Sequence, residues 1–196
     1  DATELARTVS DLNHYPISGV DLNLGCPAPV VYRKNAGGGL LRHPDQIHKI
    51  LGRLREACGA TPFTVKTRVG FESEDEFDQL LRIFKSHAID LLTIHGRTVK
   101  ERYQTPVHDD RVAQAVRTLN CPVIANGNVV NSQTGLSYLD STGAAGLMIG
   151  RGAIRNPWIF EQIRCATSKQ EIPQVTGRMI LEYITCPFYT SPSPRD

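Results

Sequence analysis

The stretch Phe63-Thr64-Val65-Lys66-Thr67-Arg68 decides the choice of fold. Its residues alternate between apolar and polar, which predicts a β-strand with Thr64, Lys66 and Arg68 on one face. Residues 91–97, Leu91-Leu92-Thr93-Ile94-His95-Gly96-Arg97, repeat the alternation and align Thr93, His95 and Arg97. Charge that falls only near the C-terminal end of a strand is typical of a barrel, whose sites gather at that rim.

Four further observations extend this pattern along the chain. Short apolar runs that end in glycine or a polar cluster predict five strands, at residues 19–25, 62–68, 89–96, 122–127 and 145–150. Amphipathic helices are predicted over 3–12, from Pro44-Asp45 onward, and over 73–87, 109–119, 131–141 and 156–166. Strands that alternate with helices indicate a parallel sheet, either doubly wound or part of a barrel. A polar residue lies at the C-terminal end of each predicted strand. These residues are Asn23, Lys66, His95, Asn126 and Arg151. The sequence therefore predicts an α/β fold, a partial TIM (β/α)8 barrel with about its last five βα units, and three more strands upstream.

The domain organisation follows from the same pattern. Residues 1–167 are expected to form the barrel domain, and residues 168–188 the start of a linker or helical domain. Residues 189–196 break abruptly in character, and we interpret them as a non-native tail, with a natural Pro/Ser linker as the alternative.

Composition excludes several classes of protein. The chain has 196 residues, of which 40% are hydrophobic and 21% charged, as in soluble globular proteins. It contains neither a membrane-spanning apolar run nor a signal peptide, so we expect a cytoplasmic protein. Its five cysteines form no CxxC pair, so neither a disulfide framework nor a metal site is expected. A net charge of +2 is too small to indicate nucleic-acid binding by itself.

Three residues could carry chemistry. Pro27 turns the chain after the first predicted strand and presents Cys26 over the barrel mouth, as a nucleophile, a proton donor or a small apolar loop residue. Lys66 points inward and needs a partner, either a polar ligand or a carboxylate such as Asp21. His95 is either a satisfied core histidine or a ligand contact.

Glycine-rich and basic segments suggest phosphate binding. Residues 33–42 are basic and rich in glycine, which suits either contacts to a phosphate backbone or a flexible loop, and they lack a nucleotide-binding fingerprint. Residues 126–128 and 150–152 close the last two predicted strands, where barrels often bind phosphate. Glycines there permit close backbone approach and Arg151 can contact an anion through two nitrogens, although ordinary tight turns are the alternative.

Six motifs in order give a more specific indication. They are NLGCP at 23–27, RKNAGGGLL at 33–41, VKTRVG at 65–70, TIHGR at 93–97, IANGN at 124–128 and MIGRGAIRNPWIF at 148–160. Together they resemble the tRNA-dihydrouridine synthases, from about residue 1 to residue 165. The resemblance implies an FMN-dependent barrel joined to a C-terminal helical domain that binds tRNA. It also implies that NADPH reduces the flavin, which then reduces the C5–C6 bond of a uridine in tRNA.

The resemblance also implies roles for individual residues. Cys26 would protonate C5 of the uridine, Asn23 would line the pocket for the base, Lys66 would bond the flavin ring and His95 would lie over or beside it. The ribityl phosphate would be held by Asn126, Gly127, Asn128, Gly150 and Arg151, and the tRNA contacts would come from Arg33, Lys34 and Arg97. The family commonly has an acidic residue where this chain has Asn128, and a backbone N–H there would serve the phosphate equally well. A uridine must leave its stack to reach such a site.

Two rival interpretations remain. An FMN barrel that acts on a free pyrimidine or a dihydroorotate-like substrate would share the lysine and the phosphate loops, but it needs no basic rim such as Arg33, Lys34 and the HGR motif at 95–97. An RNA-binding module with a vestigial flavin site would need none of Cys26, Lys66 and His95.

Overall fold

The five predicted strands form one parallel sheet in the computed structural model, which describes residues 1–185. They are β1 (Val20–Asn23), β2 (Phe63–Arg68), β3 (Leu91–His95), β4 (Val123–Asn126) and β5 (Gly146–Met148). Their order in the sheet is their order in the sequence. A doubly wound sheet reverses its strand order at a switch point, whereas successive barrel units do not, so this order favours the barrel.

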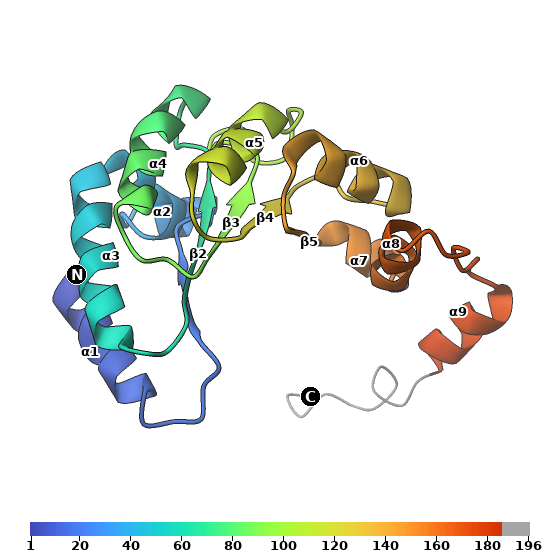
Figure 1. Cartoon of the computed structure of the whole chain (residues 1–196), viewed down its shortest axis with the longest axis horizontal. Helices are drawn as coiled ribbons and strands as arrows, with labels where there is room; N and C mark the ends of the chain where they lie inside the picture. The colour runs from blue at the N-terminus through green and yellow to red at the C-terminus, as the bar shows by residue number, and fades with distance from the viewer. Residues whose placement is uncertain (186–196) are drawn as a thin grey trace.

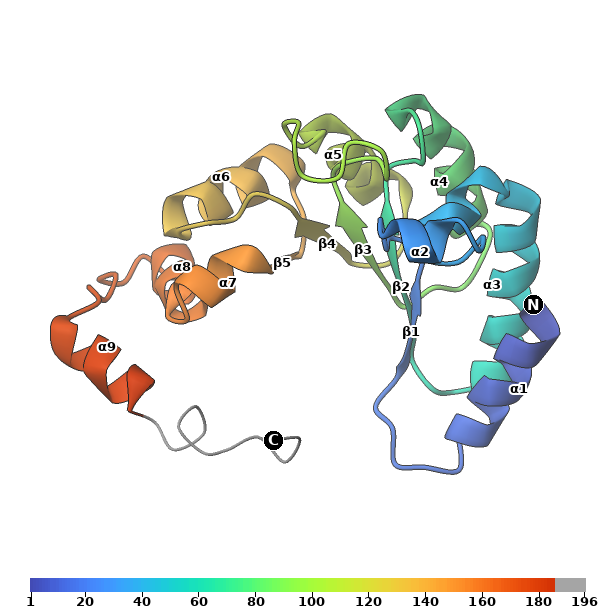
Figure 2. The same cartoon turned by 180° about the vertical axis from the view of Figure 1, so that it is seen from behind.

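The helices that follow the strands lie along one face of the sheet. Figures 1 and 2 show α3, α4, α5 and α6 following one another around the outside of its curve. The helix bounds are α1 (Ala2–Leu12), α2 (Pro29–Tyr32), α3 (Pro44–Cys58), α4 (Phe77–Lys85), α5 (Asp109–Thr118), α6 (Ser132–Thr142), α7 (Arg151–Arg155), α8 (Ile159–Thr167) and α9 (Gly177–Ile184), with 3-10 turns η1 (Gly37–Arg42) and η2 (Glu74–Glu76). All six predicted helices are present. The short elements α2, α7 and η1 were not predicted, because a segment of four to six residues is too short to show a helical period.

One predicted helix begins differently from the expectation. The segment 73–87 opens with the 3-10 turn η2, and α4 starts only at Phe77. The cause is a capping box, in which Ser73 caps the turn and the Glu76 carboxylate accepts hydrogen bonds from backbone N–H groups, including that of Phe71 at 2.6 Å. This turn carries Glu74.

The core lies between the sheet and the outer helices. Ile47, Ile50, Leu51 and Leu54 form the predicted apolar face of α3, and all are at most 2% exposed. On β2 the predicted alternation is confirmed, since Phe63 and Val65 are fully buried while Lys66 keeps partial exposure on the other face. The helices therefore cover the outer face of the sheet, so a functional site can form only on the inner face and at the strand ends.

The remaining segments are peripheral. Asp1 caps α1, which packs against α3, and α9 exposes Leu181 and Ile184. None of the described helices combines the length and apolar character needed to cross a membrane. The boundary predicted near residue 167 stays a prediction, and the predicted tail at 189–196 lies outside the described residues.

Candidate active site

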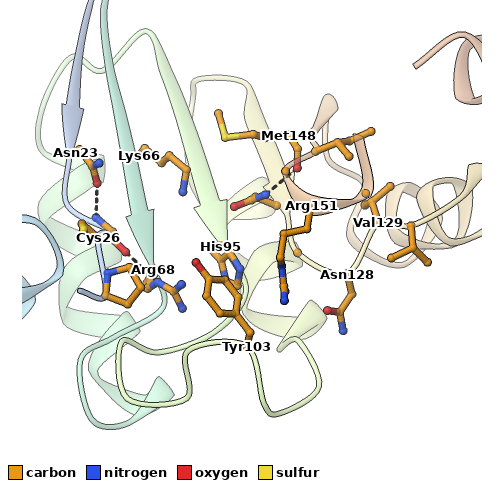
Figure 3. A pocket seen from close by; sticks show the side chains of 18 of the residues that line it. Asn23, Cys26, Lys66, Arg68, His95, Tyr103, Asn128, Val129, Met148 and Arg151 are labelled. Carbon is orange, nitrogen blue, oxygen red and sulfur yellow. Dashed lines mark hydrogen bonds between the residues drawn. The ribbon is translucent and has the colours of Figure 1, made fainter. Parts of the chain in front are cut away.

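The register of the sheet brings the polar strand ends together. Asn23 pairs with Lys66 across β1 and β2, and His95 on β3 pairs with Arg68 on one side and Asn126 on the other. These residues line a cleft of about 570 Å³ at the carboxyl ends of the strands (Figure 3). That volume is within the usual range for small-molecule and cofactor sites.

Nine of the twelve predicted site residues line this cleft. They are Asn23, Cys26, Lys66, His95, Asn126, Gly127, Asn128, Gly150 and Arg151. Arg33, Lys34 and Arg97 are absent from its lining. The structure thus brings together the residues expected to touch cofactor and base, whereas of those expected to touch RNA only Arg97 lies next to them, bonded to Asn128.

Three hydrogen bonds hold the loop that carries Cys26. The Asn23 side chain accepts a hydrogen bond from the Gly25 N–H at 2.9 Å, and Arg68 donates to the Gly25 carbonyl at 2.9 Å. The Cys26 carbonyl accepts from the Gly38 N–H at 3.1 Å. Cys26 itself is half-buried and free of any disulfide, so its thiol is presented to the cleft at a fixed place.

The glycine run at 37–39 packs against this loop. A Cβ on Gly37, whose φ is +52°, would come within 2.8 Å of the Cys26 Cβ, and one on Gly38 would come within 2.8 Å of the Cys26 carbonyl oxygen. A Cβ on Gly39 would overlap the Tyr32 carbonyl oxygen. Gly38 and Gly39 are buried in the turn η1. Residues 37–39 therefore form a packed turn and not a flexible loop, because these glycines allow two backbone segments to touch. The interpretation of residues 33–42 as a contact to a phosphate backbone stays a prediction.

Lys66 does not pair with the carboxylate suggested for it. That carboxylate, Asp21, instead accepts a hydrogen bond from Thr64 at 2.7 Å. Among the described residues the Lys66 ammonium has neither a hydrogen bond nor an ion pair. Burial, followed by the charge of Arg68, lowers the pKa of Lys66, although Asp21 and Cys26 partly oppose the shift. An ammonium with unused donors in a cleft suits a polar ligand.

His95 lies at the floor of the cleft in its neutral form. The residue is 6% exposed, and burial together with Arg68, Lys66, Arg97 and Arg151 lowers its pKa to about 3. Within the described chain its Nδ1 is buried without a hydrogen-bond partner. The interpretation of His95 as a satisfied core histidine is therefore not supported.

Arg97 is buried, contrary to its expected place on an RNA-binding surface. It is 1% exposed, and its guanidinium donates to the Thr105 carbonyl and, at 2.9 Å, to the Asn128 side chain. A group without access to solvent cannot meet a tRNA backbone directly. Arg97 instead joins the segment after β3 to the Asn126-Gly127-Asn128 turn, where Gly127 and Asn128 have φ of 137° and 52°.

The opposite side of the cleft is more open. The Asn126 amide donates to the Met148 carbonyl at 2.7 Å, which ties β4 to β5. Gly150 has no atom near the position of a Cβ, and Arg151 is exposed with its guanidinium over the Tyr103 ring at 4.2 Å. An exposed guanidinium such as that of Arg151, beside the open backbone of Gly150, is suited to binding an anion.

Among the cleft residues that the sequence analysis did not single out, Arg68 and Tyr103 bear most on the chemistry of the site. Arg68 is 2% exposed and donates to the carbonyls of Gly25, Thr98 and Arg102. Its position on the polar face of β2, two residues after Lys66, was the available signal. Tyr103 lies in a loop without periodicity, so no pattern pointed to it.

Arg33 and Lys34 are exposed, as a contact to a polyanion requires. Arg33 is the C-cap residue that follows α2, and Lys34 comes next in the turn before η1. Their role in RNA binding remains a prediction.

The fold and the cleft define a class of protein: a β/α-barrel protein with a polar site at the carboxyl ends of its strands. The sequence model of the family described as dihydrouridine synthase (Dus) matches residues 1–186. The chain belongs to this family, which confirms the resemblance found in the six motifs.

Curated relatives agree with this assignment. The chain is 36% identical over 182 residues to a probable tRNA-dihydrouridine synthase of Helicobacter pylori (strain ATCC 700392 / 26695). The matched region covers 92% of this chain and 54% of the relative. It is 39% identical over 146 residues to tRNA-dihydrouridine synthase B of Yersinia pestis, covering 74% of this chain and 45% of that protein. The chain thus spans about half the length of the relatives it matches.

Solved structures support the barrel. An old yellow enzyme homologue from Zymomonas mobilis superimposes with a TM-score of 0.60 at 15% identity, over 91% of this chain and 54% of the other. N-acetylneuraminate lyase from Mycoplasma synoviae superimposes with a TM-score of 0.61 at 12% identity, over 87% and 54%. These TIM-barrel neighbours show the fold alone, and they confirm the prediction of a partial barrel.

Proposed function

We propose that this chain is the catalytic part of a tRNA-dihydrouridine synthase, which reduces the C5–C6 double bond of a uridine in tRNA with FMN and NADPH. The observation that carries the proposal is the meeting of Cys26, the unpaired Lys66 and neutral His95 in one cleft. Family membership supplies the reaction class, and the cleft supplies residues suited to it.

The residues present fit a flavin mononucleotide. The Lys66 ammonium offers donors to the polar edge of an isoalloxazine ring, and the buried Nδ1 of His95 lacks a partner. Arg151, beside the open Gly150, offers a cation to the phosphate, together with the N–H groups of Gly127 and Asn128. Reduced FMN, when bound, supplies the hydride for C6 of the uridine.

Cys26 completes the reduction as the proton donor to C5. Its Sγ–H gives up the proton and is restored from solvent, which is ordinary general-acid catalysis. The fixed loop around Cys26 keeps the thiol in place, and the Asn23 amide, two residues before Gly25, lines the same side of the cleft for contact with the base. Reaction in this cleft requires the uridine to leave its stack.

The tRNA would approach from the side of Arg33 and Lys34. Burial of Arg97 removes one argument against a small free pyrimidine as substrate, so the basic rim now depends on this exposed pair. A tRNA substrate would also put the working protein in the cytoplasm.

The test uses a full-length protein that contains this chain, expressed in a bacterium without its own dihydrouridine synthases. We expect dihydrouridine to reappear in the tRNA, measured by mass spectrometry, and Cys26→Ala to reduce it by about 100-fold or more, the usual scale of a general acid. Cys165→Ala is the matched control, because Cys165 is half-buried on α8 away from the cleft.

Three outcomes would contradict the proposal. A folded, flavin-loaded protein that forms no dihydrouridine would favour the small-pyrimidine enzyme. Dihydrouridine at the same level with Cys26→Ala would remove Cys26 as the acid. Persistence of tRNA binding after flavin removal, without any reduction by the loaded protein, would favour an RNA-binding module.

A further inference from the structure

A histidine outside the cleft joins two carboxylates from different loops. His108, the residue before α5, places Nδ1 at 2.8 Å from Glu74 Oε2. Its Nε2 lies 2.9 Å from Glu101 Oε1 and 3.1 Å from Glu101 Oε2. Glu74 belongs to η2, in the connection after β2, whereas Glu101 belongs to the connection after β3. One imidazole ring thus holds the two connections together.

Negatively charged groups surround this ring. Its Nε2 is hydrogen-bonded to the Glu101 carboxylate, and its Nδ1 lies within ion-pair distance of the Glu74 carboxylate. Asp110 lies close to both His108 and Glu74. Arg111 is the one cation at this cluster within the described chain, 3.3 Å from Glu74, and it also contacts Asp75 and Asp78 at 3.0 and 3.4 Å.

Glu74, His108 and Asp110 are close enough together to suggest a cation site. Arg111 already contacts the Glu74 oxygen that His108 uses, and both nitrogens of His108 are engaged by carboxylates. These contacts are those of an ion-pair network, which we take the cluster to be.

Glu101 extends the network into the segment 97–107. Its carboxylate accepts from the Thr98 N–H at 2.7 Å, and its own N–H donates to the Thr98 hydroxyl at 3.2 Å. Burial acts to raise the pKa of Glu101, but the hydrogen bonds from Thr98 and His108 outweigh it, so the pKa is lowered. The His108 N–H donates to the Gly96 carbonyl at 2.6 Å, so the histidine ties down both ends of the segment.

The middle of this segment reaches the cleft. Tyr103 lies against the Arg151 guanidinium at 4.2 Å and the Arg68 guanidinium at 5.5 Å, and its ring meets that of His95 edge-on at 5.9 Å (Figure 3). The Arg102 carbonyl accepts from Arg68 at 3.1 Å. Whatever fixes the segment therefore fixes the aromatic side of the site.

We infer that His108 is a positioning residue, which joins Glu74 to Glu101 and thereby holds the segment 97–107 with Tyr103 against the cleft. The effect on turnover rests on the proposed function, whereas the effect on the segment does not.

The experiment measures amide hydrogen exchange in a full-length protein that contains this chain, with rates corrected by an unstructured reference peptide. We expect His108→Gln to speed exchange in 97–107 about tenfold, because local opening reports the lost contacts, while β2 and β3 stay protected. Glu101→Gln tests the other side of the hold and should loosen the same segment. Arg53→Gln is the matched control, since it breaks an exposed ion pair with Glu56 on α3.

Turnover gives the second readout. His108→Gln should lower kcat for dihydrouridine formation by about fivefold and leave KM for tRNA unchanged, because it displaces Tyr103 at the cleft and not the exposed Arg33 and Lys34. Unchanged exchange in both His108→Gln and Glu101→Gln would overturn the inference. If His108→Gln unfolds the sheet, Glu101→Gln decides. An absence of dihydrouridine in every variant, with the segment loosened as expected, would count against the proposed function and leave this inference standing.

Discussion

The two sides of the cleft are built in different ways. On the side of β1 and β2, the Cys26 loop is packed against Gly37–Gly39 and tied by the buried Arg68 guanidinium, which also holds two carbonyls of the segment after β3. On the side of β4 and β5, Arg151 is exposed, Gly150 stands in open space, and β5 has three residues.

This difference matches the two tasks that the proposed function sets. A proton donor must be held in place before the reaction, because preorganised groups cost no rearrangement at the moment of transfer. A site for a phosphate needs donors that are free until the anion arrives. The following predictions test whether the closed side is in fact rigid and the open side in fact permissive.

The largest effect is expected from Arg68→Ala in the full-length protein. Three carbonyls lose a charged donor, and a cavity replaces the guanidinium, so we expect a loss of about 3 kcal/mol or more in the free energy of unfolding. Denaturant titration measures it, with the exposed Arg53→Ala as control, expected within about 0.5 kcal/mol of wild type. A loss below about 1 kcal/mol would mean that water replaces the guanidinium and that the closed side is not rigid.

A pair of glycine substitutions compares the two sides directly. Gly39→Ala puts a methyl group onto the Tyr32 carbonyl, and we expect it to lower the free energy of unfolding by about 1–3 kcal/mol. Gly150→Ala meets no atom within 4 Å and should change it by no more than about 0.5 kcal/mol. Thermal unfolding of both variants gives the difference, and equal losses would remove the contrast between the two sides.

Lys66→Met separates binding from stability. The pKa of Lys66 is lowered, so the fold disfavours its charge at neutral pH, and we expect Met to stabilise the protein by about 1 kcal/mol at pH 7. The gain should shrink as pH rises toward the ordinary lysine value of 10.5, where the ammonium is neutral in the unfolded chain too. FMN affinity, followed by flavin fluorescence, should fall about tenfold. A variant that loses stability would show that Lys66 has a partner after all.

The sequence predicted the fold well because the fold depends on periodic patterns. Alternation in β2 and the apolar face of α3 fix which side of each element is buried, and both were found where expected. Arg97 shows the limit of such patterns, since alternation put it on a polar face but could not show that Thr105 and Asn128 enclose it. Tyr103 and the contacts of His108 depend on how loops meet in space, which no local pattern records.

The smallest effect is expected at the amino-terminal end of β2, the end of the sheet far from the cleft. Asp90 accepts a hydrogen bond from the Phe63 N–H at 2.7 Å and pairs with Arg55 at 2.8 Å. The Phe63 bond is the main reason that the pKa of Asp90 is lowered; burial opposes the shift and Arg55 adds to it. A lowered carboxyl pKa gives stability that is present above its ordinary value of 3.8 and is lost as pH falls through the lower folded value.

Asp90→Asn should therefore cost less than about 1 kcal/mol at pH 7, because the carboxylate is 52% exposed and water screens it. The difference from wild type should disappear in acid, as both proteins become neutral at this position. Urea titrations at pH 7 and at a pH well below 3.8, under the lowered pKa of the folded state, measure it. A cost that persists in acid would assign the effect to packing rather than charge. A cost as large as that of Arg68→Ala would show that the end of the sheet far from the cleft is held as firmly as the Cys26 loop, so rigidity would no longer distinguish the catalytic side.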